Sequence, residues 1–227
     1  MNMETETKTI VCYGDSNTWG FVPVAEDAET VEHARFPCDV RWTGVLARLL
    51  GEGYHVLEEG LNGRTTAYDD LLGKYRNGAK YLGVCLATHK PVDLLVFMLG
   101  VNDTKKHLLL PAAQIGRGVE KLIKIARSDD FGPGGLAPEI LIVSPVRIRE
   151  EILSSWLWLE FDQSSALKSY ELAEIFYNIA KRRDCYYMNA AAYAEASATD
   201  GLHLDAENHR KLAEALHKKI IEIEDTF

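Results

Sequence analysis

A serine stands directly after an apolar stretch near the start of the sequence. Residues 14–20 (GDSNTWG) follow residues 8–13 (KTIVCY), which have the composition of a strand. At the end of a strand, where a helix begins, the serine N–H points outward and the helix dipole favours an oxyanion. Ser16 is therefore a candidate nucleophile. The same residue types also form turns and helix N-caps, so that interpretation stays open.

A carboxylate and an imidazole lie three residues apart near the C-terminus, in Asp200-Gly201-Leu202-His203. This spacing lets Asp200 reach the Nδ1–H of His203 within one turn. The contact would fix the tautomer and leave Nε2 free to take a proton from a serine. Asp205 follows as a candidate N-cap of the last helix.

Two further strand ends carry groups that can donate hydrogen bonds. Residues 60–64 (GLNGR) follow the second apolar run and include Gly63, while residues 100–103 (GVND) follow the third and include Asn102. A carboxamide NH₂ can donate to a developing oxyanion without titrating. Gly63 can bring a backbone N–H close to a ligand, or can simply allow a tight turn.

Metal and thiol chemistry are weaker interpretations. Asp200, His203, Asp205 and His209 could be imagined as metal ligands, but the last two fit the start of a helix, and a serine nucleophile needs no metal. We therefore expect neither a metal nor any other cofactor. The four cysteines form no C-x-x-C pair and are expected to be free thiols.

The elements that must position these groups alternate along the chain. Five apolar runs rich in branched residues predict strands, and the patterns between them predict helices. Such alternation implies a three-layer α/β/α fold with a parallel five-stranded sheet, for which we expect a flavodoxin-like order in a single domain over residues 1–227. Ligands of such sheets bind beyond the carboxyl ends of the strands. The predicted strands are 8–13, 54–58, 93–99, 139–144 and 185–188, and the predicted helices begin near Trp42, near Ile115, at 164 and at 206.

Three segments are too long for simple connections: 20–40, 63–91 and 145–163. Loops of this length in a compact domain are usually lids or binding loops. The third contains Trp156, Trp158 and Phe161, which could line an acyl pocket, pack between subunits or belong to ordinary core.

Composition excludes several classes of protein. The chain is 47% hydrophobic and 26% charged, and it contains no apolar run of 18 residues, so we expect no membrane span. A formal net charge of −9 opposes binding to nucleic acid. The polar, acidic residues 1–10 differ from a signal peptide, and we expect a cytoplasmic protein.

Taken in order, the blocks around Ser16, Gly63, Asn102 and His203 resemble the four-block signature of the SGNH (GDSL-like) hydrolase superfamily. Further stretches resemble its mycobacterial-type arylesterase and acyltransferase branch. These stretches are 14–20, 39–47 (DVRWTGVLA), 58–66 (EEGLNGRTT), 85–89 (CLATH) and 99–105 (LGVNDTK). The resemblance spans residues 9 to about 220.

The resemblance implies a serine esterase that hydrolyses small short-acyl or aryl esters and transfers the acyl group to alcohols or peroxide. It assigns Ser16, Asp200 and His203 to a catalytic triad. It also assigns the backbone N–H groups of Ser16 and Gly63, with the Asn102 side chain, to an oxyanion hole. A homo-oligomer is implied as well.

Some alternatives remain at this point. With the same triad, the substrate could instead be an acetylated carbohydrate, a thioester or a lysophospholipid. A non-catalytic, flavodoxin-like anion-binding protein is the alternative from another class, although no nucleotide-binding glycine motif is present. Because Trp19 lies close to Ser16 in the sequence, we expect it to form an apolar wall for the substrate.

Overall fold

The sheet at the centre of the molecule has five strands in the order β2-β1-β3-β4-β5, with every neighbouring pair parallel. This computed structural model describes residues 7–25 and 34–224. The strands are β1 (Lys8–Gly14), β2 (Tyr54–Gly60), β3 (Leu94–Met98), β4 (Glu139–Ser144) and β5 (Tyr186–Asn189). The predicted parallel sheet and its flavodoxin-like order are thereby confirmed.

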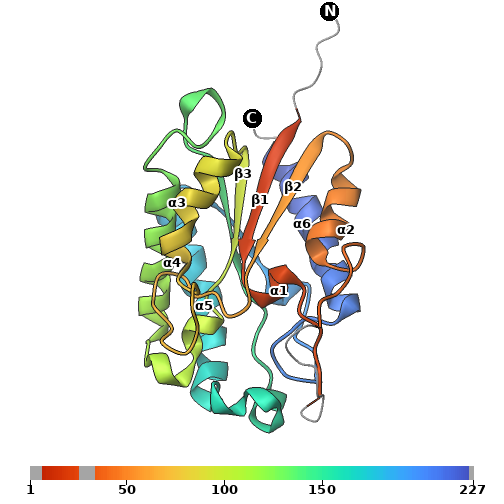
Figure 1. Ribbon diagram of the computed structural model, residues 1–227, viewed down its shortest axis with the longest axis vertical. Helices are drawn as coiled ribbons and strands as arrows, with labels where there is room; N and C mark the ends of the chain where they lie inside the picture. The colour runs from red at the N-terminus through yellow and green to blue at the C-terminus, as the bar shows by residue number, and fades with distance from the viewer. Residues whose placement is uncertain (1–6, 26–33, 225–227) are drawn as a thin grey trace, which may run out of the picture.

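Helices cover both faces of the sheet, as the predicted three-layer fold requires. In Figure 1, α3, α4 and α5 lie on one side of the strands, and α2 and α6 lie on the other. Each side has its own apolar core, because β1, β3 and β4 send alternate side chains to opposite faces. The helices are α1 (Ser16–Trp19), α2 (Trp42–Leu50), α3 (Gly78–His89), α4 (Ala112–Ala126), α5 (Gln163–Arg182) and α6 (Ala206–Glu224).

Local sequence signals explain where these helices begin. Asp162 and Ser165 form a reciprocal capping box at the start of α5. Asp205 accepts a hydrogen bond from the Asn208 N–H at 2.9 Å at the start of α6. Asn77 does the same for α3 by accepting from the Ala79 N–H at 3.1 Å.

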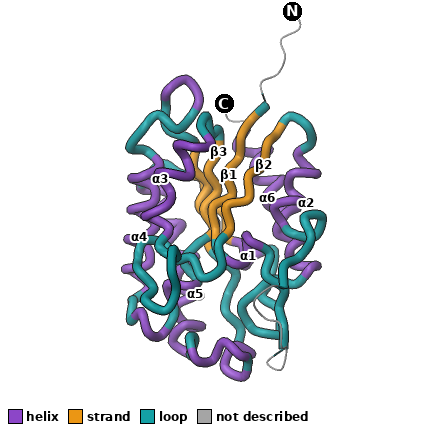
Figure 2. Tube along the Cα trace, viewed as in Figure 1, coloured by secondary structure: helices purple, strands orange, loops and turns teal. Residues whose placement is uncertain are grey.

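The loops that follow the strands gather at one end of the molecule. Figure 2 shows them beyond the carboxyl ends of the strands, at the end opposite the N-terminus. Short 3₁₀ helices give these loops much of their structure. They are η2 (Asn102–Thr104), η3 (Lys106–Leu108), η5 (Glu150–Ser154), η6 (Trp156–Leu159) and η7 (Ala190–Ala192), while η4 (Pro133–Gly135) precedes β4.

The three long segments resolve differently. Part of 20–40, namely residues 26–33, lies outside the described residues. Segment 63–91 is a loop followed by helix α3, whereas we expected a lid or a binding loop and no helix there. Segment 145–163 folds as η5 and η6 and packs its own small core against the sheet end. Among the described helices, none combines the length and hydropathy needed to cross a membrane.

Candidate active site

Ser16 is the first residue of the short helix α1, directly after β1. The Asp15 side chain caps this helix by accepting from the Asn17 N–H at 3.0 Å. Gly20 ends it in the left-handed conformation, with φ of 89°. The turn interpretation and the nucleophile interpretation of this motif are thus compatible, because the capped turn is what presents the serine.

The three residues of the predicted triad lie in one hydrogen-bonded chain. His203 Nε2 is 3.0 Å from Ser16 Oγ, and His203 Nδ1 is 2.7 Å from Asp200 Oδ2. The second Asp200 oxygen accepts from the backbone N–H groups of Leu202 and His203, at 3.0 and 2.9 Å. All three side chains are buried. The carboxylate therefore fixes both the imidazole and the backbone that carries it.

Asn17, which the sequence analysis passed over, connects the segment that carries Ser16 to the segment that carries His203. The buried side chain of Asn17 donates from Nδ2 to the Leu202 carbonyl at 3.3 Å, and its Oδ1 accepts from the Leu204 N–H at 2.9 Å. These two bonds hold the backbone on either side of His203 against α1. A signal was available, since a carboxamide directly after the serine can pair with backbone groups, but its partners are 185 and 187 residues away.

The predicted oxyanion donors lie in the wall of the same cavity as Ser16 and His203. Gly63 has a φ of 76°, which favours glycine, and a Cβ there would meet the Arg76 side chain. Asn102 uses one N–H of its amide to bond the Arg64 carbonyl at 3.2 Å. Its second N–H is available to a ligand. Within the described residues, the backbone N–H groups of Ser16 and Gly63 have no backbone acceptor.

The cavity beside Ser16 is small, with a volume of about 240 Å³. Its apolar wall comes from segments far apart in the chain. Trp156 and Phe161, from segment 145–163, are part of it, in agreement with the acyl pocket that we considered for this segment. Sequence analysis missed Phe21 and Leu202, because their place depends on how separate loops meet. The apolar lining residues are Phe21, Trp156, Leu157, Phe161 and Leu202.

The structure does not place Trp19 in this wall. The Trp19 ring packs beside Phe21, with centroids 6.3 Å apart, and the Arg35 guanidinium lies 4.9 Å from its centroid. Phe21 is the aromatic residue that reaches the site, and its ring centroid is 4.4 Å from that of His203. The expectation for Trp19 is corrected accordingly: α1 ends at Trp19, and the turn at Gly20 directs the next residue inward.

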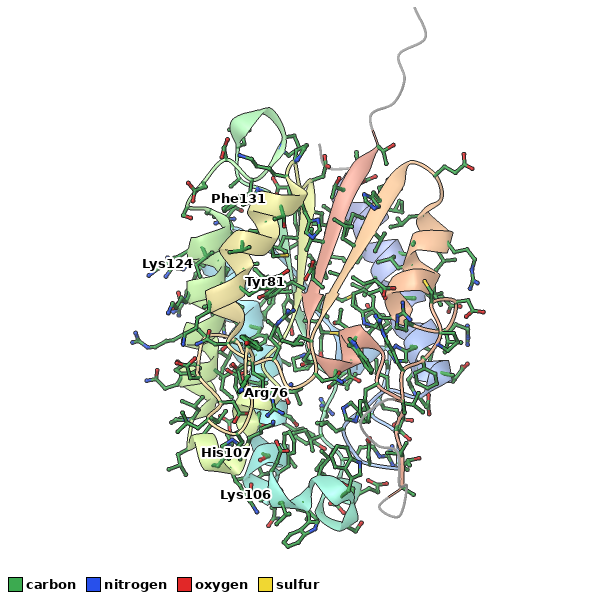
Figure 3. The ribbon with its side chains drawn as sticks, in the orientation of Figure 1. Arg76, Tyr81, Lys106, His107, Lys124 and Phe131 are labelled. Atoms are coloured by element: carbon green, nitrogen blue, oxygen red, sulfur yellow. The ribbon has the colours of Figure 1, made fainter. Side chains whose placement is uncertain are left out.

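The cavity lining also includes charged residues, two of which pair with the buried carboxylate of Asp70. Arg76 Nη1 lies 2.8 Å from this carboxylate, Lys105 Nζ 3.3 Å and His107 Nε2 3.0 Å. Lys105 also pairs with Glu160. Arg76, Lys105 and Glu160 line the cavity, and Figure 3 shows Arg76 and His107 at the loop end of the molecule. These ion pairs tie the loop before α3 to η3 and η6.

Two buried carboxyls lie behind the site. Burial raises the pKa of Asp15 to about 6, against the lowering effect of the Asn17 N–H and of His203. Burial likewise raises the pKa of Asp103 to about 7, against hydrogen bonds from the Thr66 N–H and hydroxyl. Protonation of these groups removes negative charge behind the loops that carry the oxyanion donors.

One group of side chains has the chemistry of metal ligands. Ligand atoms of Glu59, Cys85 and His89 lie within 4.8 Å of one another. Glu59 already pairs with His89 at 2.9 Å, and burial raises the pKa of the Cys85 thiol to about 12. The pairing of Glu59 with His89, beside a Cys85 thiol that stays protonated, therefore explains why these three side chains lie together. Asp205, which we had also considered as a metal ligand, caps α6 as the sequence predicted.

This arrangement has the parts needed for acyl transfer. A hydroxyl is hydrogen-bonded to an imidazole, and the imidazole is oriented by a carboxylate. The same cavity is lined by Asn102 and by two backbone N–H groups that have no backbone acceptor in the described part of the chain. The imidazole can take the serine proton, and the donors can stabilise an oxyanion next to Ser16.

Comparisons with known proteins agree with this chemistry. Residues 12–211 match the model of the GDSL-like lipase/acylhydrolase family. The aryl esterase of M. smegmatis is 37% identical, with a TM-score of 0.84 over 95% of this chain and 99% of that one. A carbohydrate acetylesterase from Sinorhizobium meliloti is 34% identical, with a TM-score of 0.85 over 95% and 99% of the two chains. No curated protein sequence matches the chain.

Proposed function

The chain belongs to the GDSL-like lipase/acylhydrolase family, and from that we propose that it is a serine esterase acting on small esters through an acyl-enzyme. One observation carries the proposal: Ser16 Oγ lies 3.0 Å from His203 Nε2, in a cavity that also contains Gly63 and Asn102. A flavodoxin-like anion-binding protein has no need of a hydroxyl, an imidazole and a carboxylate in one chain of hydrogen bonds.

In the first half of the reaction, Ser16 Oγ attacks the ester carbonyl carbon while His203 Nε2 takes the hydroxyl proton. Asp200 stabilises the resulting imidazolium through Nδ1–H. The carbonyl oxygen becomes an oxyanion, held by the N–H groups of Ser16 and Gly63 and the free N–H of Asn102. Collapse of this intermediate breaks the bond to the alcohol, which leaves with the proton from His203.

In the second half, water attacks the acyl group on Ser16 while His203 again takes a proton. The oxyanion forms in the same place, and its collapse releases the carboxylic acid and returns the proton to Ser16. An alcohol or a peroxide in place of water would yield a new ester or a peracid. The aromatic and aliphatic wall made by Phe21, Trp156 and Leu157 supports such transfer, since it favours an organic acceptor over water.

The size of the cavity supports a short acyl group. Its volume of about 240 Å³ is below the roughly 300 to 1,000 Å³ typical of pockets for drug-sized ligands. Phe21, Phe161 and Leu157, which line the cavity, are themselves buried, so their side chains occupy space beside Ser16 that a longer acyl chain would need. The similarity to an aryl esterase at 37% identity supports the same class of substrate.

A series of p-nitrophenyl esters tests the proposal. We expect kcat/KM for acetate and butyrate to exceed that for octanoate at least about tenfold, because each excluded methylene loses its burial. Adding ethanol during butyrate hydrolysis should yield ethyl butyrate. Equal rates for octanoate would contradict the small acyl site, and the absence of any ester hydrolysis would contradict the function as a whole.

A further inference from the structure

Arg64, which directly follows Gly63, is a buried cation without a counterion. The residue is 3% exposed, and no carboxylate in the described part of the chain lies within ion-pairing distance of its guanidinium. The other buried arginine and lysine side chains of this part are paired, Arg41 with Glu58 and Lys105 with two carboxylates. Burying an unpaired charge costs free energy, and groups perturbed in this way are concentrated at functional sites.

Polar groups that carry no net charge hold this guanidinium. Arg64 Nη1 donates to the Gly14 carbonyl at 3.0 Å and also to the Glu59 carbonyl, at the ends of β1 and β2. The guanidinium carbon lies 4.1 Å from the centroid of the buried Tyr13 ring, and Nε has no hydrogen-bond partner among the described residues. Carbonyl dipoles and an aromatic face stabilise the cation, but they leave its full positive charge in place.

The same residue contacts all three segments that carry the proposed oxyanion donors. Its guanidinium bonds Gly14, two residues before Ser16. Its backbone directly follows Gly63, and its carbonyl accepts from the Asn102 side chain at 3.2 Å. Because that bond fixes the plane of the Asn102 amide, it also fixes the direction of the second N–H. Arg64 therefore joins the ends of three neighbouring strands at the oxyanion hole.

The charge of Arg64 acts on the segment that carries the nucleophile. Burial raises the pKa of Asp15, next to Ser16, to about 6, and the charge of Arg64 is among the effects that lower it. Arg64 does not line the catalytic cavity, so it can affect the reaction only through its charge and through the groups that it holds. Charges interact more strongly in a buried setting than in water, because the effective dielectric constant is lower.

We propose that Arg64 is a positioning residue of the oxyanion hole, which it orients through Gly14 and Asn102 and whose oxyanion its uncompensated charge stabilises. The proposal rests on the proposed function, because the oxyanion forms only when Ser16 attacks an ester. The negative charge exists in the tetrahedral intermediate and not in the bound ester. Arg64 should therefore affect kcat far more than KM.

Two inhibitors separate the charged state of the site from the neutral one. With propylboronic acid, Ser16 Oγ bonds to boron, the hydroxyl proton passes to His203, and boron takes the negative charge of a tetrahedral adduct. Butyramide carries the same propyl group on a neutral, planar carbonyl. The ratio of the two inhibition constants therefore reports how well the site stabilises an anion.

Arg64→Met removes the charge and the donors while keeping a long side chain in the same buried place. We expect the inhibition constant of propylboronic acid to rise about 10- to 100-fold, and kcat for p-nitrophenyl butyrate to fall by a similar factor. KM and the inhibition constant of butyramide should stay within about threefold. Arg64→Lys keeps the charge, so its inhibition constant for propylboronic acid should be at least about threefold below that of Arg64→Met. Arg64→Gln takes the place of the methionine variant should that variant fail to fold.

Arg41→Met is the matched control. Arg41 is also buried and also donates to a backbone carbonyl, that of Phe36 at 2.8 Å, but it does not line the catalytic cavity. This variant should leave the ratio of the inhibition constants unchanged, whatever its effect on thermal unfolding. Equal changes for both inhibitors in Arg64→Met, or none, overturn the role of Arg64, and so does a lysine variant no better than the methionine one. A wild type that neither hydrolyses esters nor binds the boronic acid contradicts the proposed function itself, and the role of Arg64 with it.

Discussion

At the residue scale, the position of His203 depends on backbone contacts as well as on Asp200. His203 lies between Leu202 and Leu204, whose carbonyl and N–H are both bonded to the Asn17 side chain. Asn17 directly follows Ser16, so the segment that carries the base is fastened to the turn that carries the nucleophile. The G-D-S-L motif after which the family is called ends in leucine, where this chain has Asn17.

We predict that Asn17 acts as a positioning residue. Asn17→Leu removes both hydrogen bonds at similar volume, and the 202–204 segment should move relative to Ser16. We expect kcat for p-nitrophenyl acetate to fall about 10- to 100-fold with KM nearly unchanged, because small displacements of a catalytic group cost rate. Steady-state kinetics measure both constants, and Asn17→Ser provides a milder variant should the leucine variant fold poorly.

Asn208→Ala is the matched control for Asn17. Its side chain is also buried and also bonds backbone, since Oδ1 accepts from the Glu195 N–H at 3.0 Å, but it does not flank His203. Thermal unfolding should show similar losses of stability in both variants, with kcat lowered only at Asn17. Equal kcat values in the two variants and the wild type would show that the bonds at Asn17 serve folding alone.

Residue types and strand order were enough to predict part of this site. Parallel strands place their carboxyl ends along one edge, so serine, glycine and asparagine after three of them were expected to meet. The pairing of Asp200 with His203 was recognisable from their spacing in the sequence. Phe21 and Asn17 were not predicted, and Trp19 was misplaced, because their positions depend on how separate loops pack rather than on any local pattern.

At the element scale, the buried carboxylate of Asp70 joins the loop between β2 and α3 to a second segment. Asp70 contacts Arg76 on its own loop, Lys105 between η2 and η3, and His107 within η3. Lys105 extends the network to Glu160, after η6. Three segments that line the catalytic cavity are therefore coupled through one residue.

Replacing Asp70 with alanine should mainly lower the free energy of unfolding. We expect a smaller effect on the rate of ester hydrolysis. Lys105, whose side chain is 4% exposed, would lose one of its two counterions, and Arg76 would lose its own. Breaking a buried pair in this way costs about 3 kcal/mol of unfolding free energy. Urea unfolding measures it, and Asp130→Asn, a carboxylate 62% exposed, should change it by less than about 0.5 kcal/mol.

The pH dependence of this effect has a definite sign. Burial tends to raise the pKa of Asp70, but hydrogen bonds from Arg76, the Leu72 N–H and His107, with the charge of Lys105, hold it well below its usual value of 3.8. Because the pKa of Asp70 is lower in the folded protein than in the unfolded one, the ionised carboxylate stabilises the fold at pH values above its unfolded-state pKa. This stabilisation is lost as the pH falls through the folded-state pKa. The difference between wild type and Asp70→Ala should be constant near neutrality and shrink below about pH 4. A difference that grows there would contradict this assignment.

Helix α3 shows why one element escaped prediction. Its apolar residues Leu82, Cys85 and Leu86 are buried at helical spacing, but Gly78 and Gly83 interrupt the pattern and lower the helix propensity. The Asn77 cap and packing against α4 overcome this. Helices α2, α4, α5 and α6 and all five strands were predicted close to their observed positions, since their periodicity is stronger.

At the scale of the whole molecule, the sheet brings the residues of the site together at one of its edges. β1, β2 and β3 are adjacent and end at the same edge, so Ser16, Gly63 and Asn102 follow neighbouring strands. Gly60 allows this closeness, because a Cβ there would collide with the backbone of α1 at Trp19. A homo-oligomer, a cytoplasmic location and the absence of a metal or nucleic-acid partner stay predictions from the sequence.

The most direct test of the account is covalent labelling of the serine. Wild-type protein treated with a fluorophosphonate should gain the mass of one phosphonyl group, located by peptide mass spectrometry on Ser16, and should lose its activity on p-nitrophenyl acetate in proportion. The Ser16→Ala variant should remain unlabelled and inactive, with unchanged thermal unfolding. Labelling of another residue, or ester hydrolysis that survives in Ser16→Ala, would contradict Ser16 as the nucleophile.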